Sequence, residues 1–273
     1  MNNDLIKYKI GIAGLGMVGG SLRRYFEKKP HYKLFLYDLK GIGSLDELNR
    51  ADFVYLCLPT PYNIEIGCDI TVIEKVVSQI KGNKILIIKS TVMPGATDKL
   101  QEKYCRHKFL FNPEFLTEAT ADEDMCFPDR QIVGYTDKSY DVAKDILQQL
   151  PLAPFERIAP AVVAEFIKYG GNTWFSVKVA KNNEMYDLCK KFGLDEKKWE
   201  MVVDGMAADK RIGRTHLTIM HKNKRGYFGK CLPKDAKALL DFAKKLEVDM
   251  PVLEAADKYN DKLLESQGYK KYI

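Results

Sequence analysis

The sequence predicts an α/β fold in two parts: an N-terminal Rossmann-type doubly wound parallel sheet followed by an all-α dimerisation domain. Three observations support this prediction. Short apolar runs alternate with helical patterns through the first half of the chain, a glycine-rich turn follows the first run, and only long helical patterns follow Pro160. We therefore expect a cofactor-binding domain over residues 1–159 and a helical domain over residues 160–273.

The glycine-rich turn has the spacing of a dinucleotide-binding fingerprint. A strand pattern over residues 7–13 leads into Gly14-Leu15-Gly16-Met17-Val18-Gly19, and a helical pattern follows. The first glycine permits the tight turn, the second lets the backbone approach a pyrophosphate, and the third lets the helix pack closely. The cofactor contacts expected here are Gly14, Gly16, Met17, Val18 and Gly19.

A second expected strand, Lys33 to Tyr37, ends in Asp38. A carboxylate at this position can accept hydrogen bonds from ribose hydroxyls, and it repels the 2′-phosphate of NADP. The expected cofactor is therefore NAD, with Asp38 among its contacts. The alternative is that Asp38 is an ordinary turn residue at the end of a strand.

Further strands are expected at residues 53–58, 84–88, 108–111, 131–134 and 155–158, with helices at 44–50, 69–80 and 139–150. In a doubly wound sheet the ligand lies beyond the carboxyl ends of the parallel strands. The segments that follow three of these strands are 59–61, 90–95 and 112–118. We expect all three on one rim of the sheet.

The helical part is expected to contain helices at residues 161–192, 199–208, 234–246 and 251–266. Lys168 and Asn172 are four residues apart on the first of these, so they share a face and can stabilise a developing oxyanion. A solvated polar stripe is the alternative. Apolar residues surround much of this helix and predict a homodimer: Phe166, Trp174, Phe175, Val177 and Val179.

Cys231 lies in a short turn sequence, Gly226 to Asp235, between Lys230 and Lys234. Nearby positive charge favours the thiolate, which is the nucleophilic form, so this thiol is a candidate to attack an aldehyde. A buried cysteine that packs as a small hydrophobe is the alternative.

Composition narrows the remaining function classes. The six cysteines form no C-x-x-C pair, so neither a metal site nor a disulfide framework is expected. The net charge of +6 is spread along the helices, and nucleic acid is not an expected partner. No apolar run suits a membrane span and the polar start lacks a secretory signal, so a cytoplasmic protein is expected. The basic run 216–225 is either a phosphate clamp or a solvated loop.

The chain resembles the UDP-glucose/GDP-mannose dehydrogenase family, whose NAD-dependent members oxidise the primary alcohol of a nucleotide sugar to a carboxylate. The resemblance runs from about Lys9 to Asn260 in the family's order of motifs. These are the glycine fingerprint, Ser90-Thr91-Val92-x-Pro94-Gly95-x-Thr97, Asn112-Pro113-Glu114-Phe115-Leu116-x-Glu118, Ala164-Glu165-x-x-Lys168-Tyr169-x-x-Asn172, Asn183-Glu184, Arg211-Ile212-Gly213 and Cys231-x-Pro233-Lys234-Asp235.

The resemblance implies a division of labour among these residues. Cys231 forms a thiohemiacetal and then a thioester, Lys168 and Asn172 hold the oxyanion, Asp235 and Thr91 assist proton transfer with a water, and Glu118 activates the hydrolytic water, with Glu114 supporting them. Further cofactor contacts are expected at Pro59, Thr60, Thr91 and Glu118. Substrate contacts are expected at Phe115, Leu116, Lys168, Asn172, Arg225, Tyr227 and Gly229.

Three departures from the family leave the substrate open. The segment 41–49 is short, Phe228 stands where the family has a glycine, and the resemblance implies that the family's C-terminal nucleotide-binding domain is absent from this chain. A nucleotide sugar is the expected substrate, and a smaller sugar or polyol is an alternative. A dimeric NAD-binding homologue without turnover is a second alternative, and a hydroxyacid dehydrogenase performing one oxidation is a third.

Overall fold

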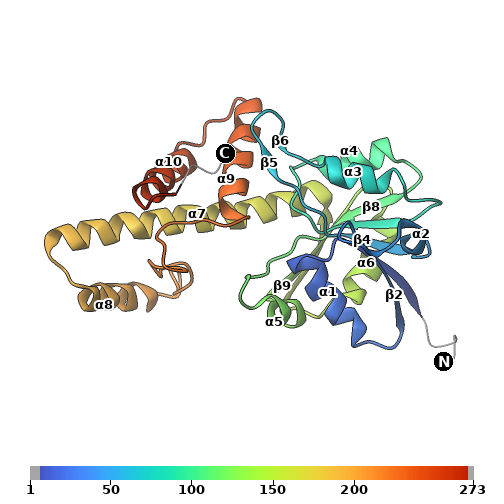
Figure 1. Ribbon diagram of the computed structural model, residues 1–273, viewed down its shortest axis with the longest axis horizontal. Helices are drawn as coiled ribbons and strands as arrows, with labels where there is room; N and C mark the ends of the chain where they lie inside the picture. The colour runs from blue at the N-terminus through green and yellow to red at the C-terminus, as the bar shows by residue number, and fades with distance from the viewer. Residues whose placement is uncertain (1–6, 270–273) are drawn as a thin grey trace. The chain divides into compact units, whose positions relative to one another are not determined.

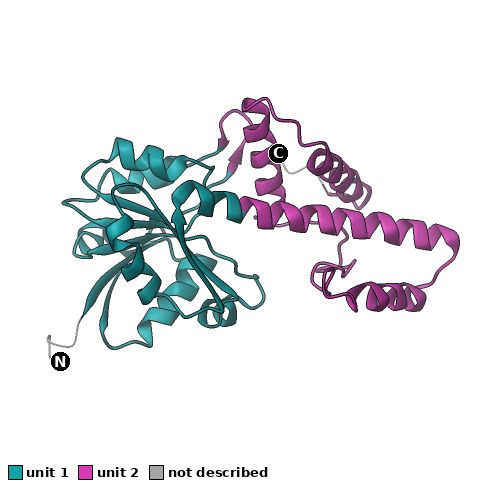
Figure 2. Cartoon of the chain, turned by 180° about the vertical axis from the view of Figure 1, so that it is seen from behind, with its two compact units in different colours: residues 1–61, 68–168 teal, residues 62–67, 169–273 magenta. Residues whose placement is uncertain are grey.

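The structure, a computed structural model, describes residues 7–269, and its chain divides into two units (Figure 1, Figure 2). Unit 1 contains the chain as far as Pro61 together with Cys68–Lys168. Unit 2 contains Tyr62–Gly67 and the chain from Tyr169 onward. The sequence-based boundary after residue 159 stays a prediction.

Unit 1 is built on an eight-stranded sheet with the order β10-β9-β8-β7-β4-β1-β2-β3. Strand β1 pairs in parallel with β2 on one side and with β4 on the other, so the strand order reverses beside it. Such a switch point is where doubly wound sheets bind ligands. The strands are β1 (Tyr8–Ala13), β2 (Tyr32–Asp38), β3 (Ile42–Gly43), β4 (Phe53–Leu56), β7 (Ile85–Ile88), β8 (Lys108–Phe111), β9 (Arg130–Tyr135) and β10 (Phe155–Pro160).

The predicted fold class is confirmed, with two interruptions of the parallel pattern. Strands β8 and β9 pair antiparallel, and so do β2 and β3. The remaining pairs of the sheet are parallel. An expectation of strictly parallel strands misses the reversal at β9, because strand direction is not encoded in the apolar pattern of a strand.

Helices cover both faces of the sheet (Figure 1). Successive strand residues enter opposite cores: Ile87 and Leu110 pack on the side of α1 and α6, whereas Ile88 and Phe111 pack on the side of α3 and α4. Burial on both faces explains the continuous apolar runs of these strands. The helices of unit 1 are α1 (Met17–Glu27), α2 (Leu45–Leu48), α3 (Thr71–Val77), α4 (Ala96–Lys103), α5 (Ala121–Cys126) and α6 (Tyr140–Gln149).

The short segment after Asp38 forms the edge strand β3 and the single-turn helix α2. A capping box starts this helix: the Ser44 hydroxyl accepts from Glu47 N and the Glu47 carboxylate accepts from Ser44 N, both at 3.1 Å. Helices α4 and α5 and the small hairpin of β5 (Tyr62–Asn63) and β6 (Gly67–Cys68) were not expected from the sequence. All are short, and short segments carry little periodicity.

Helix α7 (Ala161–Phe192) begins in unit 1 and continues into unit 2. Its first turns pack on the sheet beside Gly134, where an added Cβ would lie 2.8 Å from the Ala161 Cα. Unit 2 also contains α8 (Glu196–Ala207), α9 (Leu232–Lys245) and α10 (Pro251–Ser266). Helix α8 begins three residues earlier than expected because the Asp195 carboxylate caps it by accepting from Lys198 N at 2.9 Å.

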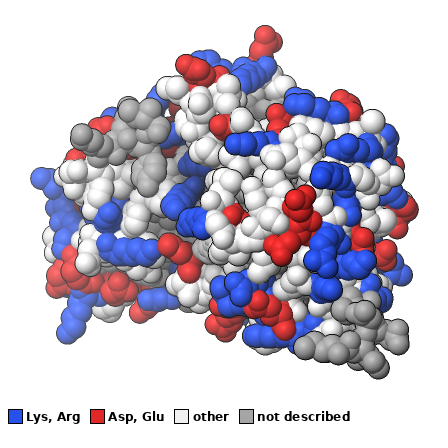
Figure 3. All heavy atoms as spheres, turned by 45° about the vertical axis from the view of Figure 1, so that its right-hand side comes forward, with Lys and Arg blue, Asp and Glu red and all other residues white. Residues whose placement is uncertain are grey.

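Lysine and arginine side chains are interspersed with acidic ones over the face drawn in Figure 3. Among residues 7–269, none of the helices has the length and apolar character to cross a bilayer.

Candidate active site

The fingerprint turn places its first and last glycines where side chains have no room. Gly14 has a φ of 89°, and a Cβ there would lie 2.4 Å from the Cys57 carbonyl oxygen. At Gly19 the added atom would lie 1.8 Å from the Gly14 carbonyl oxygen, whereas Gly16 faces open space. The turn therefore requires glycine at both ends for its own shape and leaves its middle open to a ligand.

Helix α1 presents an uncapped N-terminus at this turn. Its N-cap residue, Gly16, makes no side-chain capping bond, and its first turn contains no acidic side chain. Backbone N–H groups at such a terminus attract an anion such as a pyrophosphate. Asp38 bonds to the same turn: its carboxylate accepts from Leu15 N at 2.7 Å and also from Lys40 N at 2.9 Å. These two hydrogen bonds lower the pKa of Asp38 and keep it ionised. The donors, the open glycine and the acidic residue fit an NAD molecule.

A hollow of about 410 Å³ in unit 1 brings together two of the expected cofactor residues, Met17 of α1 and Glu118. In the wall of this hollow, two side chains of α1 bond to Asp122 of α5. The Ser21 hydroxyl donates to the Asp122 carboxylate at 2.6 Å, and Arg24 forms an ion pair with it. These contacts hold α1 against α5 beside the expected cofactor position.

The three rim segments follow β4, β7 and β8, which are parallel neighbours, so they lie at one edge of the sheet as expected. The Thr60 hydroxyl donates to the Thr91 carbonyl at 2.7 Å, and the Ser90 hydroxyl donates to the Leu58 carbonyl at 2.6 Å. Pro59 lies between Leu58 and Thr60. Thus Thr60 and Thr91, both expected cofactor contacts, are linked directly.

Lys168 and Glu114 form a buried ion pair in unit 1. The Lys168 ammonium lies 3.0 Å from a Glu114 carboxylate oxygen and donates to the Glu114 carbonyl at 2.6 Å, with 5% and 9% of the two side chains exposed. Burial alone would raise the pKa of Glu114, but the charge of Lys168 and the Leu116 N–H outweigh it, and the pKa is lowered. Lys168 also lies 5.7 Å from the centre of the Phe115 ring. Four expected site residues therefore meet here.

Lys89 is a functional candidate that the sequence reasoning missed. It directly follows β7, is 4% exposed, and donates to the Asn112 side-chain oxygen at 2.6 Å. Burial lowers its pKa to about 8, although the charge of Glu114 opposes that shift. A lysine at the end of an otherwise apolar strand, just before Ser90-Thr91, was the available signal.

Glu165 lies in the first turns of α7, three residues before Lys168, and its carboxylate bonds to the start of α4. One carboxylate oxygen accepts from Gly95 N at 2.6 Å, and the other accepts from Thr97 N at 2.9 Å and from the Thr97 hydroxyl at 2.6 Å. These donors begin helix α4, so Glu165 caps that helix from a distant element. The pKa of Glu165 is raised because burial outweighs these hydrogen bonds, which by themselves would lower it.

In unit 2, Cys231 is exposed and occupies the N-cap position of α9, and its carbonyl accepts from Asp235 N at 2.9 Å. A helix N-terminus stabilises a thiolate, a cause that adds to the lysines considered from sequence. The buried Asp235 carboxylate accepts from the Asn172 amide at 2.6 Å and pairs with Lys234 at 2.5 Å. The structure therefore joins Asn172, Asp235 and the Cys231 turn.

Two of the expected substrate residues are engaged within unit 2. The Arg225 guanidinium pairs with Asp187 at 2.6 Å and donates to the Asn183 side chain at 3.1 Å. Tyr227 is 3% exposed, and its hydroxyl donates to Asp257 at 3.0 Å. The arginine of the basic run is thus paired with a carboxylate, and the phosphate-clamp interpretation of the run stays a prediction. The third expected substrate residue in this loop, Gly229, has a φ of 89° and open space beside it.

Comparison with known proteins identifies both parts of the chain. Residues 38–150 match the NAD binding domain of the UDP-glucose/GDP-mannose dehydrogenase family, and residues 162–262 match the central domain of the same family. A UDP-glucose 6-dehydrogenase from Rickettsia bellii is 35% identical over 225 residues, which cover 79% of this chain and 50% of that protein. The chain spans about half the length of the curated relatives it matches.

Solved structures share the fold. A UDP-glucose dehydrogenase from the archaeon Pyrobaculum islandicum superposes with a TM-score of 0.82 at 23% identity, over 98% of this chain and 73% of that one. A 3-hydroxyisobutyrate dehydrogenase from Mycobacterium tuberculosis gives a TM-score of 0.72 at 16% identity, over 94% of both chains. At these identities the likeness concerns the fold alone.

Proposed function

Because the chain belongs to the UDP-glucose/GDP-mannose dehydrogenase family, we propose that it oxidises the primary alcohol of a nucleotide sugar to a carboxylate in two steps. The cofactor of its N-terminal domain is NAD. The observation that carries the proposal is the position of Cys231, an exposed thiol at the start of α9 whose neighbour Asp235 is buried against Asn172.

The thiol accounts for an oxidation in two steps. Bound NAD supplies the two-electron acceptor for each oxidation. The Cys231 sulfur bonds to the aldehyde carbon, and the resulting alkoxide takes up a proton to give a thiohemiacetal. Its oxidation leaves a thioester, and water then breaks the carbon–sulfur bond to release the carboxylate and restore the thiol. Covalent capture keeps the aldehyde from escaping between the two oxidations.

The proposed oxyanion donors are Lys168 and Asn172. Glu114 orients the Lys168 ammonium and balances its charge, which supports a fixed donor rather than a mobile base. One preorganised donor of this kind is worth about 3 to 4 kcal/mol of transition-state stabilisation in other enzymes. We assign Asp235 and Thr91, with a water, to proton transfer, and Glu118 to activation of the hydrolytic water.

A smaller sugar or polyol is the second candidate substrate, and one observation favours it. The Phe228 ring lies 5.6 Å from the His221 ring and 5.3 Å from the Lys224 ammonium, so the loop before Cys231 carries a bulky side chain packed by its own neighbours. Such a loop leaves less space for a large substrate. The alternative of a binding protein without turnover predicts no product from any alcohol.

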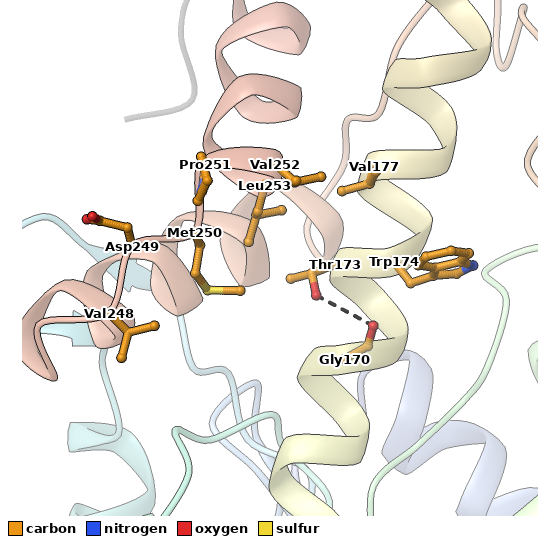
Figure 4. Close-up of a pocket in the computed structure, with 10 residues that line it drawn as sticks. All are labelled: Gly170, Thr173, Trp174, Val177, Val248, Asp249, Met250, Pro251, Val252 and Leu253. Atoms are coloured by element: carbon orange, nitrogen blue, oxygen red, sulfur yellow. Dashed lines mark hydrogen bonds between the residues drawn. The ribbon is translucent and has the colours of Figure 1, made fainter.

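Homodimerisation through α7 is also part of the proposal. Trp174 is 67% exposed beside an open, mostly apolar hollow of about 410 Å³ (Figure 4). Figure 4 shows Val252 and Leu253 of α10 on the other side of this hollow. Phe175, by contrast, stacks on His216, and Val177 and Val179 pack within unit 2. The exposed set is thus smaller than the sequence indicated, but it still offers an apolar surface to a second copy. A cytoplasmic location is proposed with it.

The test is NADH formation with UDP-glucose, GDP-mannose, free glucose and polyols as separate substrates. The proposal expects two NADH for each carboxylate formed, and it expects Cys231→Ser to bind NAD normally while losing carboxylate production. Cys105→Ser, at another exposed thiol, is the matched control. Carboxylate production by Cys231→Ser at the wild-type rate contradicts the proposal, as does a single NADH for each substrate oxidised.

A further inference from the structure

Helix α10 holds the chain just before Cys231 through two side-chain amides. The Asn260 amide accepts from Tyr227 N at 2.8 Å and donates to the Tyr227 carbonyl at 2.9 Å. The Gln267 amide accepts from Arg225 N at 2.8 Å and donates to the Arg225 carbonyl at 3.2 Å. Each amide therefore satisfies both backbone groups of one residue, as a neighbouring β-strand would do.

The two amides hold residues on either side of Gly226. Asn260 lies in α10 and Gln267 is the C-cap residue of that helix, seven residues further on. The residues that they hold, Arg225 and Tyr227, are two apart and flank the bend at Gly226. Gly226 lies between them with a φ of 85°, and a Cβ there would come within 2.6 Å of the Asn260 side-chain oxygen. The fit of Asn260 to this turn therefore requires a glycine at 226.

Asp257, one turn before Asn260, bonds to one residue on each side of Cys231. One carboxylate oxygen accepts from the Tyr227 hydroxyl at 3.0 Å, and the other accepts from the Lys237 ammonium at 2.9 Å. Tyr227 precedes Cys231 by four residues and Lys237 follows it by six. Asn260 is 1% exposed and Asp257 is 8% exposed, so both sets of bonds are shielded from water.

We propose that Asn260 and Asp257 are positioning residues for Cys231, acting by fixing the two flanks of its turn so that the sulfur stays at the N-terminus of α9. The proposal rests on the nucleophilic role assigned to Cys231 above. Both act through the backbone and side chains that flank the thiol. Their effect is to keep the thiol within the field of the helix, where the thiolate is favoured. If the bonds of Asn260 and Asp257 to the flanks of the turn are removed, residues 228–230 can move and the thiol is no longer held in the field of the helix.

The experiment measures the rate of Cys231 alkylation by iodoacetamide in the native protein, by peptide mass spectrometry over a series of pH values. Cys105, which is exposed in unit 1, is the internal reference. In Asn260→Ala we expect the Cys231 rate relative to Cys105 to fall by about fivefold or more at neutral pH, because thiolate is lost. We also expect the pH of half-maximal rate to move upward.

Asp257→Asn keeps the shape of the side chain and removes its charge, so it is the milder second variant. It should shift the pH profile in the same direction by a smaller amount, since Lys237 retains Asp261 at 3.2 Å. Lys262→Ala, at an exposed position on the same helix, is the control and should leave the profile unchanged. Circular dichroism confirms that each variant is folded before its rate is compared.

The outcomes separate this proposal from the proposed function. If Asn260→Ala and Asp257→Asn both fold and the pH profile of Cys231 alkylation is unchanged in both, the positioning role is overturned, even where wild-type Cys231 reacts quickly. A wild-type Cys231 that reacts no faster than Cys105 contradicts the nucleophilic role instead. If Asn260→Ala fails to fold, the folded Asp257→Asn variant decides: a shifted profile supports the positioning role and an unshifted one rejects it.

Discussion

Two glycine-containing turns lead into helices in this molecule, and they reach similar geometry by different means. The fingerprint turn enters α1 and the cysteine turn enters α9, and Gly14 and Gly229 share a φ of 89°. At the first turn the N-cap is Gly16, which leaves the helix N–H groups to a ligand. At the second the N-cap is Cys231, which brings a thiol to the helix terminus without a side-chain capping bond. A terminus that begins with glycine suits a bound phosphate, whereas one that begins with cysteine can favour a thiolate.

The two turns also differ in what fixes their shape. The fingerprint turn is set by backbone contacts around Gly14 and Gly19. The cysteine turn is set by buried side chains of α10, about 30 residues further along the chain, through Asp257 and Asn260. Substitutions should therefore affect the two turns differently.

The largest expected effect on cofactor binding is at Gly19. In Gly19→Ala the new methyl would overlap the Gly14 carbonyl oxygen, so the turn must open. We expect NAD affinity to fall by about 100-fold or more in calorimetry, and the melting temperature to fall with it. Gly16→Ala is the matched variant, because its methyl faces open space. It should keep the melting temperature and lose NAD affinity alone, and equal melting losses in both variants would contradict this account of the turn.

The largest expected effect on folding stability is at the buried ion pair of unit 1. Glu114→Gln leaves the Lys168 ammonium buried without its counter-charge, and breaking such a pair costs about 3 to 5 kcal/mol. The pKa of Glu114 is lowered in the folded protein, so its contribution is present above the unfolded value and is lost as pH falls through the folded value. In urea unfolding the gap between wild type and variant should therefore narrow in acid. A gap that does not change with pH contradicts this sign.

Lys89 should give a pH dependence of the same sign, but in the alkaline range. Its pKa is lowered to about 8, so between that value and the ordinary lysine value the unfolded chain binds more protons than the folded one. Wild-type stability should then gain a contribution from Lys89 as pH rises through this window. Lys89→Met should remove that contribution from the pH dependence of the melting temperature. An identical slope in wild type and variant would show that Lys89 does not titrate there.

Asp38 gives the smallest effect of these. Asp38→Asn keeps one oxygen for the Leu15 N–H and removes the charge that excludes a 2′-phosphate. We expect NAD affinity to fall by about tenfold and the preference for NAD over NADP to shrink. Calorimetry with both cofactors measures this, and Lys40→Ala, beside it in the sequence, is the control. Tighter binding of NADP than of NAD by the wild-type protein would contradict the assignment.

The same contrast explains how far sequence could predict the fold and the site. The turn at the fingerprint glycines was predictable because neighbouring backbone dictates it, and the strands were predictable from their apolar runs. The antiparallel entry of β9 was not predictable, because strand direction depends on partners distant in sequence. Asn260 and Asp257 were missed for a related reason: each acts by bonding to an element far along the chain. Glu165 was recognised in a motif, but its bonds to the start of α4 were not predictable.

Competitive alkylation tests most directly the claim that Cys231 is a nucleophile. The native protein is treated with limiting iodoacetamide, and the rates at all six cysteines are compared by mass spectrometry. This measurement needs no knowledge of the substrate. We predict that Cys231 reacts faster than the other five, and faster than the exposed Cys105 by about tenfold at neutral pH, because the N-terminus of α9 favours its thiolate. A Cys231 that reacts no faster than Cys105 would contradict the claim.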